Sequence, residues 1–391
     1  MRVIRANIPL NLRDSEGYET VVEALKDYVV PDDIPYTYIK YNLGKHIIRN
    51  EDFYPLVISK KYIGQDLTNK KVIIFRNGGI GDLIFFVPAL RFLKKKYEGL
   101  NITVCCDRRF MKLLDSLDEV DRVINIPLLF TEVLDSDYYI NFEGLIENNP
   151  EAEIENAYDL HNKKFYVNIP ENEKCPVLKV DEKIDTNVKR MLDKDIKEKK
   201  KIITIAFSST VNVRAVPPQF WMNLIHALGY DYKFYIVGTR RQVPGIENMI
   251  NGLDKRLQEI CVNWCKNTVI LNDFRYTMAL VKNSDVVIAP DSGLLHVAGG
   301  FNIPMIGLYG AFHSDLRLKY YKNAIGINAM SSCMYARGDY KGCFFHGDNN
   351  CPMAKKYMDV YSPCMKLITP EHVIKSLKEL KIIEDDKEKD S

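Results

Sequence analysis

Two glycine-containing turns hold the side chains best suited to chemistry. The first, RNGGIGD, places Asp82 directly after Gly78, Gly79 and Gly81. Glycine allows positive φ and lets a ligand approach the backbone closely. Asp82 has two interpretations, a cap for the following helix or a general base kept ionised by the helix dipole. The turn has neither the third glycine of a dinucleotide fingerprint nor the Gly-Lys-Ser/Thr of a phosphate loop.

The second turn lies in VVIAPDSGLLHVAGG, where Asp291, Ser292 and Gly293 begin a helix after an apolar strand. The unpaired N–H groups of that helix start and the Ser292 hydroxyl favour binding of a diphosphate. Asp291 would repel phosphate, so it is interpreted as the N-cap or as an acceptor for sugar hydroxyls. His296, one turn further on, either donates to a phosphate oxygen or is a buried structural histidine.

The loop SSTVNVRAVPP offers hydroxyl donors and one cation. A guanidinium beside a nucleotide diphosphate would stabilise the leaving group as the glycosidic bond breaks, and the alternative is a solvated surface arginine. The candidates in this loop are Ser208, Ser209, Thr210 and Arg214.

Nine cysteines are scattered over the chain, a number and density that indicate mostly reduced thiols. Four of them cluster towards the C-terminus without a C-x-x-C pair, and they are interpreted as a structural zinc site or as free or paired thiols. These four are Cys333, Cys343, Cys351 and Cys364.

Strand-like and helix-like stretches alternate from Lys71 onwards, which predicts parallel, doubly wound sheets. The first set of strands is KVIIF, ITVCC, RVINI and YYINF, and the second is IITIAF, KFYIVGT, VVIAP and PMIGLYG. Both turns described above directly follow a predicted strand. Ligands of such sheets bind at the carboxyl ends of the strands, so these positions suit a site.

At 391 residues the chain is long enough for two domains. The lysine-rich stretch ending in KDIKEKKK predicts the boundary between them. The predicted parts are a small β-rich extension at 1–70 that includes strands near Tyr36–Tyr41 and His46–Ile48, domains at 71–190 and 200–368, a closing helix at 369–380 and a disordered tail at 381–391.

Composition and charge exclude several classes of protein. The chain is 46% hydrophobic and 27% charged, as in ordinary globular proteins, and its net charge of +2 provides no global field for nucleic acid or an acidic membrane. No apolar run approaches the roughly 18 residues of a membrane span. We therefore expect a cytoplasmic protein, with peripheral membrane contact left open.

Four segments together resemble glycosyltransferase family 9, the heptosyltransferase-like family, between residues 71 and 380. They are RNGGIGDLIFFVPALRFLKKKY, SSTVNVRAVPPQFW, APDSGLLHVAGG with IPMIGLYG, and CMKLITPEHV. The resemblance implies the GT-B fold of two facing Rossmann-like domains, with nucleotide sugar bound by the C-terminal one and acceptor by the N-terminal one. It also implies an inverting, metal-independent transfer in which Asp82 is the general base.

The resemblance assigns roles residue by residue. The DSG turn and His296 match the donor motif of the family. Arg214 stands where the family commonly has lysine in Lys-x-Trp-Pro, which here reads Arg-Ala-Val-Pro. Glu247 lies near the position where members hold the ribose of the nucleoside.

The resemblance implies an ADP-linked, heptose-like donor and a hydroxyl acceptor, whether a glycan, a lipid-linked glycan, a protein or modified nucleic acid. Residues 1–70 have no counterpart in the bacterial lipopolysaccharide heptosyltransferases. Two alternatives stay open: a NAD-type oxidoreductase, favoured by Asp107 after the second strand, and a non-catalytic binding subunit.

Overall fold

The computed structural model describes most of the chain from residue 60 onwards and several strands before it. The described residues are 60–384, with gaps at 127, 130, 133–134, 148, 210, 330–332, 334, 336–342 and 344–350, together with 2–6, 10–13, 19–23, 26–30 and 47–49. The chain forms two compact units: unit 1 contains Met1–Asn149 and Leu160–Ile169, and unit 2 contains Pro150–Asp159 and Pro170–Ser391.

Unit 1 is built on a five-stranded sheet in the order β6-β11-β7-β8-β9, and every neighbouring pair is parallel. Its strands are β6 (Lys60–Lys61), β7 (Lys71–Phe75), β8 (Asn101–Cys106), β9 (Arg122–Asn125) and β11 (Tyr138–Asn141). Residue Asn141 of β11 lies opposite Phe75 of β7, so these two neighbouring strands end side by side. The residues that follow them therefore share one edge of the sheet.

The described strands of the N-terminal segment pair in antiparallel fashion. Strands β1 (Arg2–Ala6), β4 (Asp27–Val30) and β5 (Ile47–Arg49) form a sheet with β10 (Leu128–Leu129), while β2 (Leu10–Arg13) pairs with β3 (Glu19–Val22). Because β10 comes from the later part of unit 1, this sheet is tied to the rest of the unit by backbone pairing. The predicted strand Tyr36–Tyr41 lies outside the described residues.

The long helix predicted after the first glycine turn is two helices. Helix α2 (Ile80–Phe85) ends at Phe86, and α3 (Val87–Lys96) begins directly after it with Pro88 in its first turn. Proline has no N–H for the carbonyl of residue 84, and its ring crowds the preceding turn, so the helix breaks here. A short α2 thus carries Asp82 in its first turn, followed by buried apolar residues.

Unit 2 contains a six-stranded parallel sheet in the order β14-β13-β12-β15-β16-β17. The predicted strands of the second set correspond to β12 (Lys201–Ala206), β13 (Tyr232–Val237), β15 (Val286–Pro290) and β16 (Met305–Tyr309). The edge strands β14 (Cys261–Asn263) and β17 (Ala324–Asn328) were not predicted. The order reverses direction at β12 and β15, and ligands of open parallel sheets bind beside such a reversal. Two parallel, doubly wound sheets are thus confirmed.

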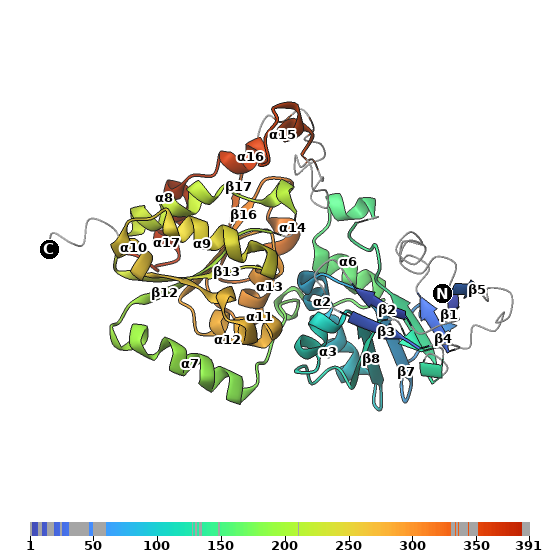
Figure 1. The fold of residues 1–391 in the computed structure, drawn as a ribbon. Helices are drawn as coiled ribbons and strands as arrows, with labels where there is room; N and C mark the ends of the chain where they lie inside the picture. Colours follow the sequence, from blue (N-terminus) through green and yellow to red (C-terminus); the bar gives the residue numbers. More distant parts are fainter. Residues whose placement is uncertain are drawn as a thin grey trace. The chain divides into compact units, whose positions relative to one another are not determined.

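Helices cover both faces of this sheet (Figure 1). Helices α8 (Pro218–Leu228), α9 (Val243–Asn251) and α17 (Pro370–Glu379) pack with alternate strand residues such as Ile203, Ile205 and Phe234 into one apolar core. Helices α7 (Glu182–Lys197), α12 (Phe274–Lys282) and α13 (Gly293–Gly300) pack together on the other face. There the hydroxyl of Tyr235 donates to Asp195 of α7 at 2.6 Å. Successive strand residues point to opposite faces, which explains this division.

The remaining helices are short. In unit 1 α4 is Met111–Leu114, and α6 (Ala157–Lys164) spans the point where the chain returns to unit 1. In unit 2 they are α10 (Lys255–Glu259), α11 (Thr268–Asn272), α14 (Asp315–Leu318), α15 (Pro352–Lys356) and α16 (Pro363–Lys366).

The division between the units comes earlier than the predicted boundary. The lysine-rich stretch was expected to end the first domain at about residue 190, but α7, which contains it, belongs to unit 2. Most of its charges are exposed, while Ile184, Val188 and Leu192 are buried against the rest of unit 2. A charged helix whose apolar stripe packs on unit 2 was therefore taken as the boundary between the domains. The expected helix at 369–380 is α17, and residues 385–391 of the expected tail lie outside the described residues.

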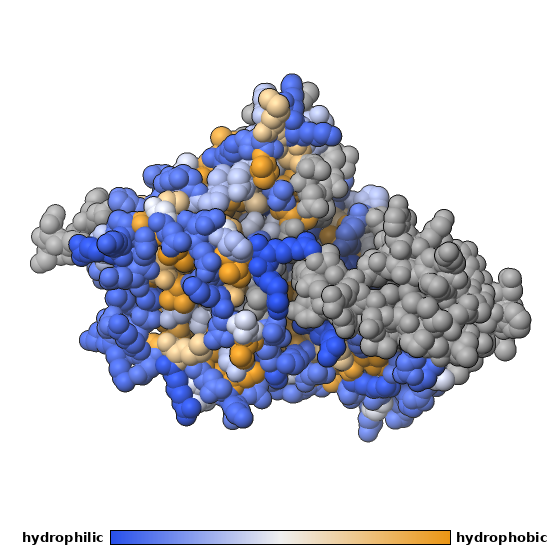
Figure 2. All heavy atoms as spheres, viewed as in Figure 1, coloured by the Kyte–Doolittle hydropathy of each residue, from blue (hydrophilic) through white to orange (hydrophobic). Residues whose placement is uncertain are grey.

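Within the described residues, no helix has both the length and the apolar character needed to cross a membrane. The described surface in Figure 2 is largely hydrophilic, with apolar residues scattered among charged ones.

The core of unit 2 predicts a large effect for Trp221→Phe. Trp221 is fully buried, and its indole Nε1 donates to the Phe207 carbonyl at 2.8 Å. The variant loses apolar volume and leaves that carbonyl without its partner, so the free energy of unfolding should fall by about 2–3 kcal/mol. Denaturant unfolding measures this fall, with Met191→Ala on the exposed side of α7 as the control. A loss no larger than that of the control would contradict the packing described here.

Candidate functional site

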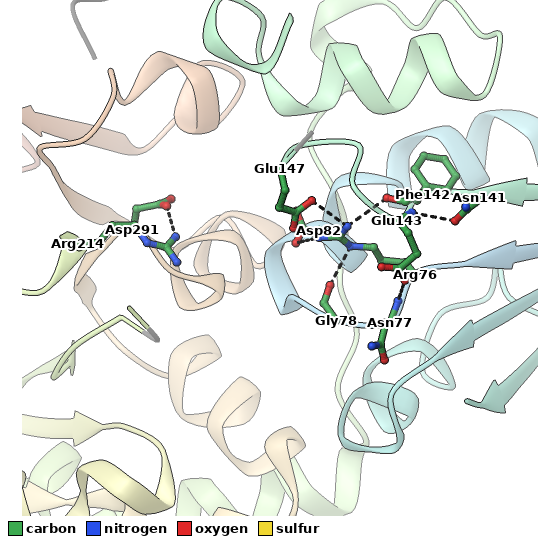
Figure 3. Close-up of polar contacts among 10 residues, drawn as sticks. All are labelled: Arg76, Asn77, Gly78, Asp82, Asn141, Phe142, Glu143, Glu147, Arg214 and Asp291. Carbon is green, nitrogen blue, oxygen red and sulfur yellow. Dashed lines mark hydrogen bonds and ion pairs between the residues drawn. The ribbon is translucent and has the colours of Figure 1, made fainter. Parts of the chain in front are cut away.

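A buried arginine organises the carboxyl ends of the strands in unit 1. Arg76 follows β7 directly and is 4% exposed. Its guanidinium donates to Asp82 at 2.6 Å, to Glu147 at 2.7 Å and to the Phe142 carbonyl at 3.1 Å (Figure 3). Its Nε also donates to the carbonyl of Gly78 at 2.9 Å. One side chain thus fixes the glycine turn, the start of α2 and the segment after β11.

Asp82 is held as an ion-pair partner and does not cap its helix. Helix α2 begins after Gly79, which has a φ of 86°, and no side chain caps it. The carboxylate of Asp82 folds back over Gly79, where a Cβ would come within 2.1 Å of its Oδ2. Gly79 therefore needs to be glycine for both its backbone conformation and this contact. The capping interpretation of Asp82 is wrong, because Arg76 takes the carboxylate instead.

A third carboxylate lies close to this ion pair and was not predicted. Glu143 follows β11, and its side chain accepts the N–H of Asn77 in the glycine turn (Figure 3). Burial raises the pKa of Glu143, and the N–H of Asn77 and the charge of Arg76 oppose that rise only in part. Signals for both Arg76 and Glu143 existed in the sequence, since each stands next to the end of a predicted strand.

Asp107, the residue that favoured the oxidoreductase alternative, is engaged by a neighbour. Its carboxylate accepts the backbone N–H of Arg109 at 2.8 Å and pairs with the guanidinium of the same residue at 2.8 Å. The side chain therefore caps a short helical turn and is paired with Arg109.

In unit 2 the two predicted loops meet through a buried ion pair. Arg214 Nη1 lies 2.5 Å from Asp291 Oδ2 (Figure 3). Burial alone would raise the pKa of Asp291, but Arg214 and then Arg317 outweigh it and lower that pKa. Asp291 is therefore ionised and paired, and its expected role as the N-cap of α13 is wrong. Arg214 is not the solvated surface arginine of the alternative interpretation.

Helix α13 begins directly after this ion pair. Ser292 is its N-cap residue, yet the Ser292 hydroxyl caps nothing and, among the described residues, this buried oxygen has no hydrogen-bond partner. The first N–H groups of any helix also have no partner within the helix. These groups can donate to an anion, as the sequence predicted for Ser292 and Gly293.

The loop after β12 offers fewer available hydroxyl groups than expected. The hydroxyl of Ser209 donates to the Val211 carbonyl at 2.6 Å, so it serves its own turn. Ser208 lies in the same loop, and Thr210 lies outside the described residues. Glu247 on α9 pairs with Lys266 at 3.1 Å and keeps 39% of its side chain exposed. Neither Ser209 nor Glu247 is brought to the Arg214–Asp291 pair by a described contact.

His296 is buried behind the start of α13. It is 2% exposed, and its Nδ1 lies 2.9 Å from the hydroxyl of Tyr321. Burial lowers the pKa of His296 to about 3, with Arg317 acting in the same direction and Asp291 against it. The ring is therefore neutral at physiological pH.

Two further side chains at this edge were not predicted. Arg317, on α14 after β16, is 5% exposed, and no carboxylate among the described residues lies within ion-pair distance of it. Its guanidinium packs over the Phe312 ring at 4.6 Å and donates to the Leu316 carbonyl. Tyr309, at the end of β16, is 1% exposed, and within the described part of the chain its hydroxyl has no partner. Burial and the nearby Asp291 raise the pKa of Tyr309.

The four C-terminal cysteines are free thiols that lie near one another. Burial raises the pKa of Cys364 to about 12, and the charges of the other three add to the rise. The described residues nevertheless contain no group of three or more His, Cys, Asp or Glu side chains arranged to hold a metal ion. As the thiols are placed, they match the interpretation as free thiols and do not form the ligand set of the zinc alternative.

Comparison with known proteins identifies the family. The family model described as glycosyltransferase family 9 (heptosyltransferase) matches residues 146–340, a segment that contains Arg214, Asp291 and His296. The chain belongs to glycosyltransferase family 9. The matched segment begins after Asp82, so the candidate residues of unit 2 lie inside the match and the glycine turn of unit 1 does not.

A stretch of 79 residues is 33% identical to lipooligosaccharide heptosyltransferase 2 of Haemophilus influenzae and covers 20% of this chain and 22% of that relative. ADP-heptose lipopolysaccharide heptosyltransferase II of E. coli is similar in structure, with a TM-score of 0.59 and 16% identity over 80% of this chain and 98% of that one. At this identity the likeness shows the family 9 fold.

TibC of enterotoxigenic E. coli, described as an iron-containing dodecameric glycosyltransferase, matches over 97% of this chain and 91% of its own, with a TM-score of 0.51 and 14% identity. It has also been solved in complex with ADP-D-β-D-heptose. Its match covers a larger share of this chain than that of heptosyltransferase II.

The Arg214–Asp291 pair predicts a pH-dependent loss of stability in Arg214→Ala. This variant leaves a buried carboxylate unpaired, so near neutral pH the free energy of unfolding should fall by about 3–5 kcal/mol. In the wild type the lowered pKa of Asp291 contributes stability above the unfolded value of about 3.9, and this contribution is lost as the pH falls through the folded value. In the variant burial dominates and protonation of Asp291 restores stability, so the difference should shrink in acid.

Denaturant unfolding across a pH series measures this effect. Arg190→Ala, on the exposed side of α7, is the control and should stay within about 0.5 kcal/mol of the wild type at every pH. Adding Asp291→Asn to Arg214→Ala should recover part of the loss. A difference between Arg214→Ala and the wild type that does not change with pH would show that Asp291 is not the group responsible.

Proposed function

We propose that the protein is an inverting glycosyltransferase that moves a heptose-like sugar from an ADP-linked donor to a hydroxyl acceptor. Unit 2 holds the diphosphate of the donor, and Asp82 of unit 1 takes the proton of the acceptor hydroxyl. The acceptor oxygen attacks the anomeric carbon as the bond from that carbon to the diphosphate oxygen breaks. The sugar is transferred with inversion, and the nucleoside diphosphate leaves with the bonding electron pair.

The observation that carries this proposal is the presence of two guanidinium groups near Asp291 at the start of α13, one of them buried. Arg214 pairs with the ionised carboxylate of Asp291, while Arg317 is buried and has no carboxylate within ion-pair distance among the described residues. A buried charge without a counter-ion is costly. A bound diphosphate would supply the missing negative charge and accept hydrogen bonds from the helix start and the Ser292 hydroxyl.

The same groups can also stabilise the diphosphate as the leaving group. As the glycosidic bond breaks, negative charge grows on the diphosphate, and fixed guanidinium and N–H donors stabilise that charge without having to reorganise. The hydroxyl of Tyr309, buried and without a described partner, is a further donor at the end of the neighbouring strand β16. The substitution of arginine for the usual lysine keeps the charge and adds donor groups, one of which is occupied by Asp291.

Asp82 is suited to act as the base because its ion pair with Arg76 holds the carboxylate in one orientation. An ion pair makes a carboxylate a weaker base, because protonation of the carboxylate leaves its cation without a partner. Arg76 has a second carboxylate partner that limits this cost. Glu147 binds the same guanidinium at 2.7 Å, and its charge still compensates Arg76 after Asp82 has taken a proton. The buried arginine is therefore not left unpaired at any step of the reaction.

The proposal names a specific donor but only the chemical class of the acceptor. The solved relatives are described as an ADP-heptose heptosyltransferase and as a heptosyltransferase in complex with ADP-D-β-D-heptose, which supports an ADP-heptose donor. For the acceptor the proposal specifies a hydroxyl group only.

Nucleotide binding is the first test. ADP should raise the thermal midpoint of the protein, since a ligand at a hundred times its dissociation constant adds about 2.7 kcal/mol of stability. NAD should give no comparable shift, and Arg317→Met, which removes the unpaired cation while keeping a similar shape, should abolish most of the ADP shift. Stabilisation by NAD with none by ADP, UDP or GDP would refute the transferase proposal.

Asp82→Asn tests the base. The variant should lower turnover of a donor and acceptor pair by at least about a hundredfold, the usual contribution of general base catalysis, while binding of ADP stays unchanged. Slow hydrolysis of candidate donor sugars, scanned without acceptor, identifies the donor first.

Glu143→Gln is the matched control for this test. Glutamine keeps an acceptor for the Asn77 N–H, and Glu143 lies beside the same arginine, so its loss should change turnover much less than the loss of Asp82. If turnover survives in Asp82→Asn but not in Glu143→Gln, Glu143 is the base and the assignment to Asp82 is wrong.

A further inference from the structure

A chain of buried hydroxyl groups ends on the donor-side histidine. The hydroxyls of Tyr158 and Tyr321 lie 2.6 Å apart, and the hydroxyl of Tyr321 lies 2.9 Å from His296 Nδ1. Tyr158 is fully buried, and Tyr321 is 6% exposed. Tyr158 lies in Pro150–Asp159, the first of the two segments that form unit 2. Residues far apart in the sequence therefore contribute to one line of polar groups.

The position of Tyr321 is enforced by packing. Its ring lies against Gly299 on α13, where a Cβ would fall 2.1 Å from the ring. Gly299 therefore makes room for Tyr321, and Gly300 does the same for Leu178. A ring held this closely keeps its hydroxyl at one place beside His296.

The direction of the hydrogen bonds follows from the chemistry of the partners. His296 is neutral, so its ring has one N–H and one bare nitrogen. A bare imidazole nitrogen is a much better acceptor than a phenol oxygen, and a phenol O–H is a good donor. The favourable order therefore runs from the Tyr158 O–H to the Tyr321 oxygen, and from the Tyr321 O–H to His296 Nδ1.

We propose that Tyr321 is a positioning residue that fixes His296 in the tautomer with its hydrogen on Nε2, so that the neutral ring offers an N–H to the diphosphate of the donor. The second half of this proposal rests on the proposed function, because it requires a diphosphate at the start of α13. The opposite tautomer would place a lone pair on Nε2, which repels phosphate oxygens. A neutral donor also avoids burying a third positive charge beside Arg214 and Arg317.

Nitrogen NMR of the protein labelled with ¹⁵N-histidine tests the tautomer directly. The His296 signals are assigned as those lost in His296→Gln. At neutral pH the wild type should show hydrogen on Nε2 and a bare, hydrogen-bonded Nδ1. In Tyr321→Phe the Nδ1 resonance should move as its bond is lost. Tyr320→Phe is the matched control, because that neighbouring hydroxyl donates to Asp159 instead.

Hydrogen on Nδ1 in the wild type, a charged ring, or an Nδ1 resonance that is the same in Tyr321→Phe would each overturn the assignment of the tautomer. The wild-type spectrum decides the tautomer even if a variant folds poorly. Tyr158→Phe should keep hydrogen on Nε2, because Tyr321 can still donate to Nδ1.

Binding of ADP tests the second half. Tyr321→Phe should weaken ADP binding about tenfold, the effect of one hydrogen bond, whereas Tyr320→Phe should not. Unchanged ADP binding in Tyr321→Phe would overturn the role in donor recognition. If the wild type bound no ADP, the proposed function would fail while the tautomer result would stand on its own.

Discussion

The ion pair between Arg214 and Asp291 is the interaction on which the proposed donor site of unit 2 depends. It joins the loop after β12 to the end of β15, the two strands at which the order of the sheet reverses. A buried carboxylate in this position is tolerable only with its cation. The pair therefore fixes where α13 begins, and with it the N–H groups and hydroxyls that surround the start of that helix.

In unit 1 another arginine, Arg76, also pairs with carboxylates at the end of a parallel sheet. Arg76 is buried at the end of β7 and holds Asp82 and Glu147, one on α2 and one after β11. In both units the arginine binds carboxylates that stand in neighbouring loops at the carboxyl edge of a parallel sheet. The difference lies in the balance of charge, because unit 1 has several carboxylates around one arginine and unit 2 has two arginines around one carboxylate. The former suits proton transfer, and the latter suits an anion.

Electrostatics also explains why the histidine of the donor motif is neutral. In the buried setting of α13 a charged imidazole would stand beside two guanidinium groups, and burial keeps the ring uncharged. A neutral ring has two tautomers, so something must select between them. The tyrosine that contacts it is held in place by a glycine on the same helix, which links the packing of α13 to the hydrogen-bonding character of the site.

The sequence by itself determined the two parallel sheets, the two glycine turns and the family resemblance, because apolar strands and turn residues are local signals. It misplaced the unit boundary, since a charged surface on α7 looks like a linker until its apolar stripe is buried. It also predicted helix caps at Asp82 and Asp291 that do not form, because Arg76 pairs with Asp82 and Arg214 pairs with Asp291. Only the tertiary structure decided the partners of buried charges, since those depend on which loops meet at the edge of a sheet.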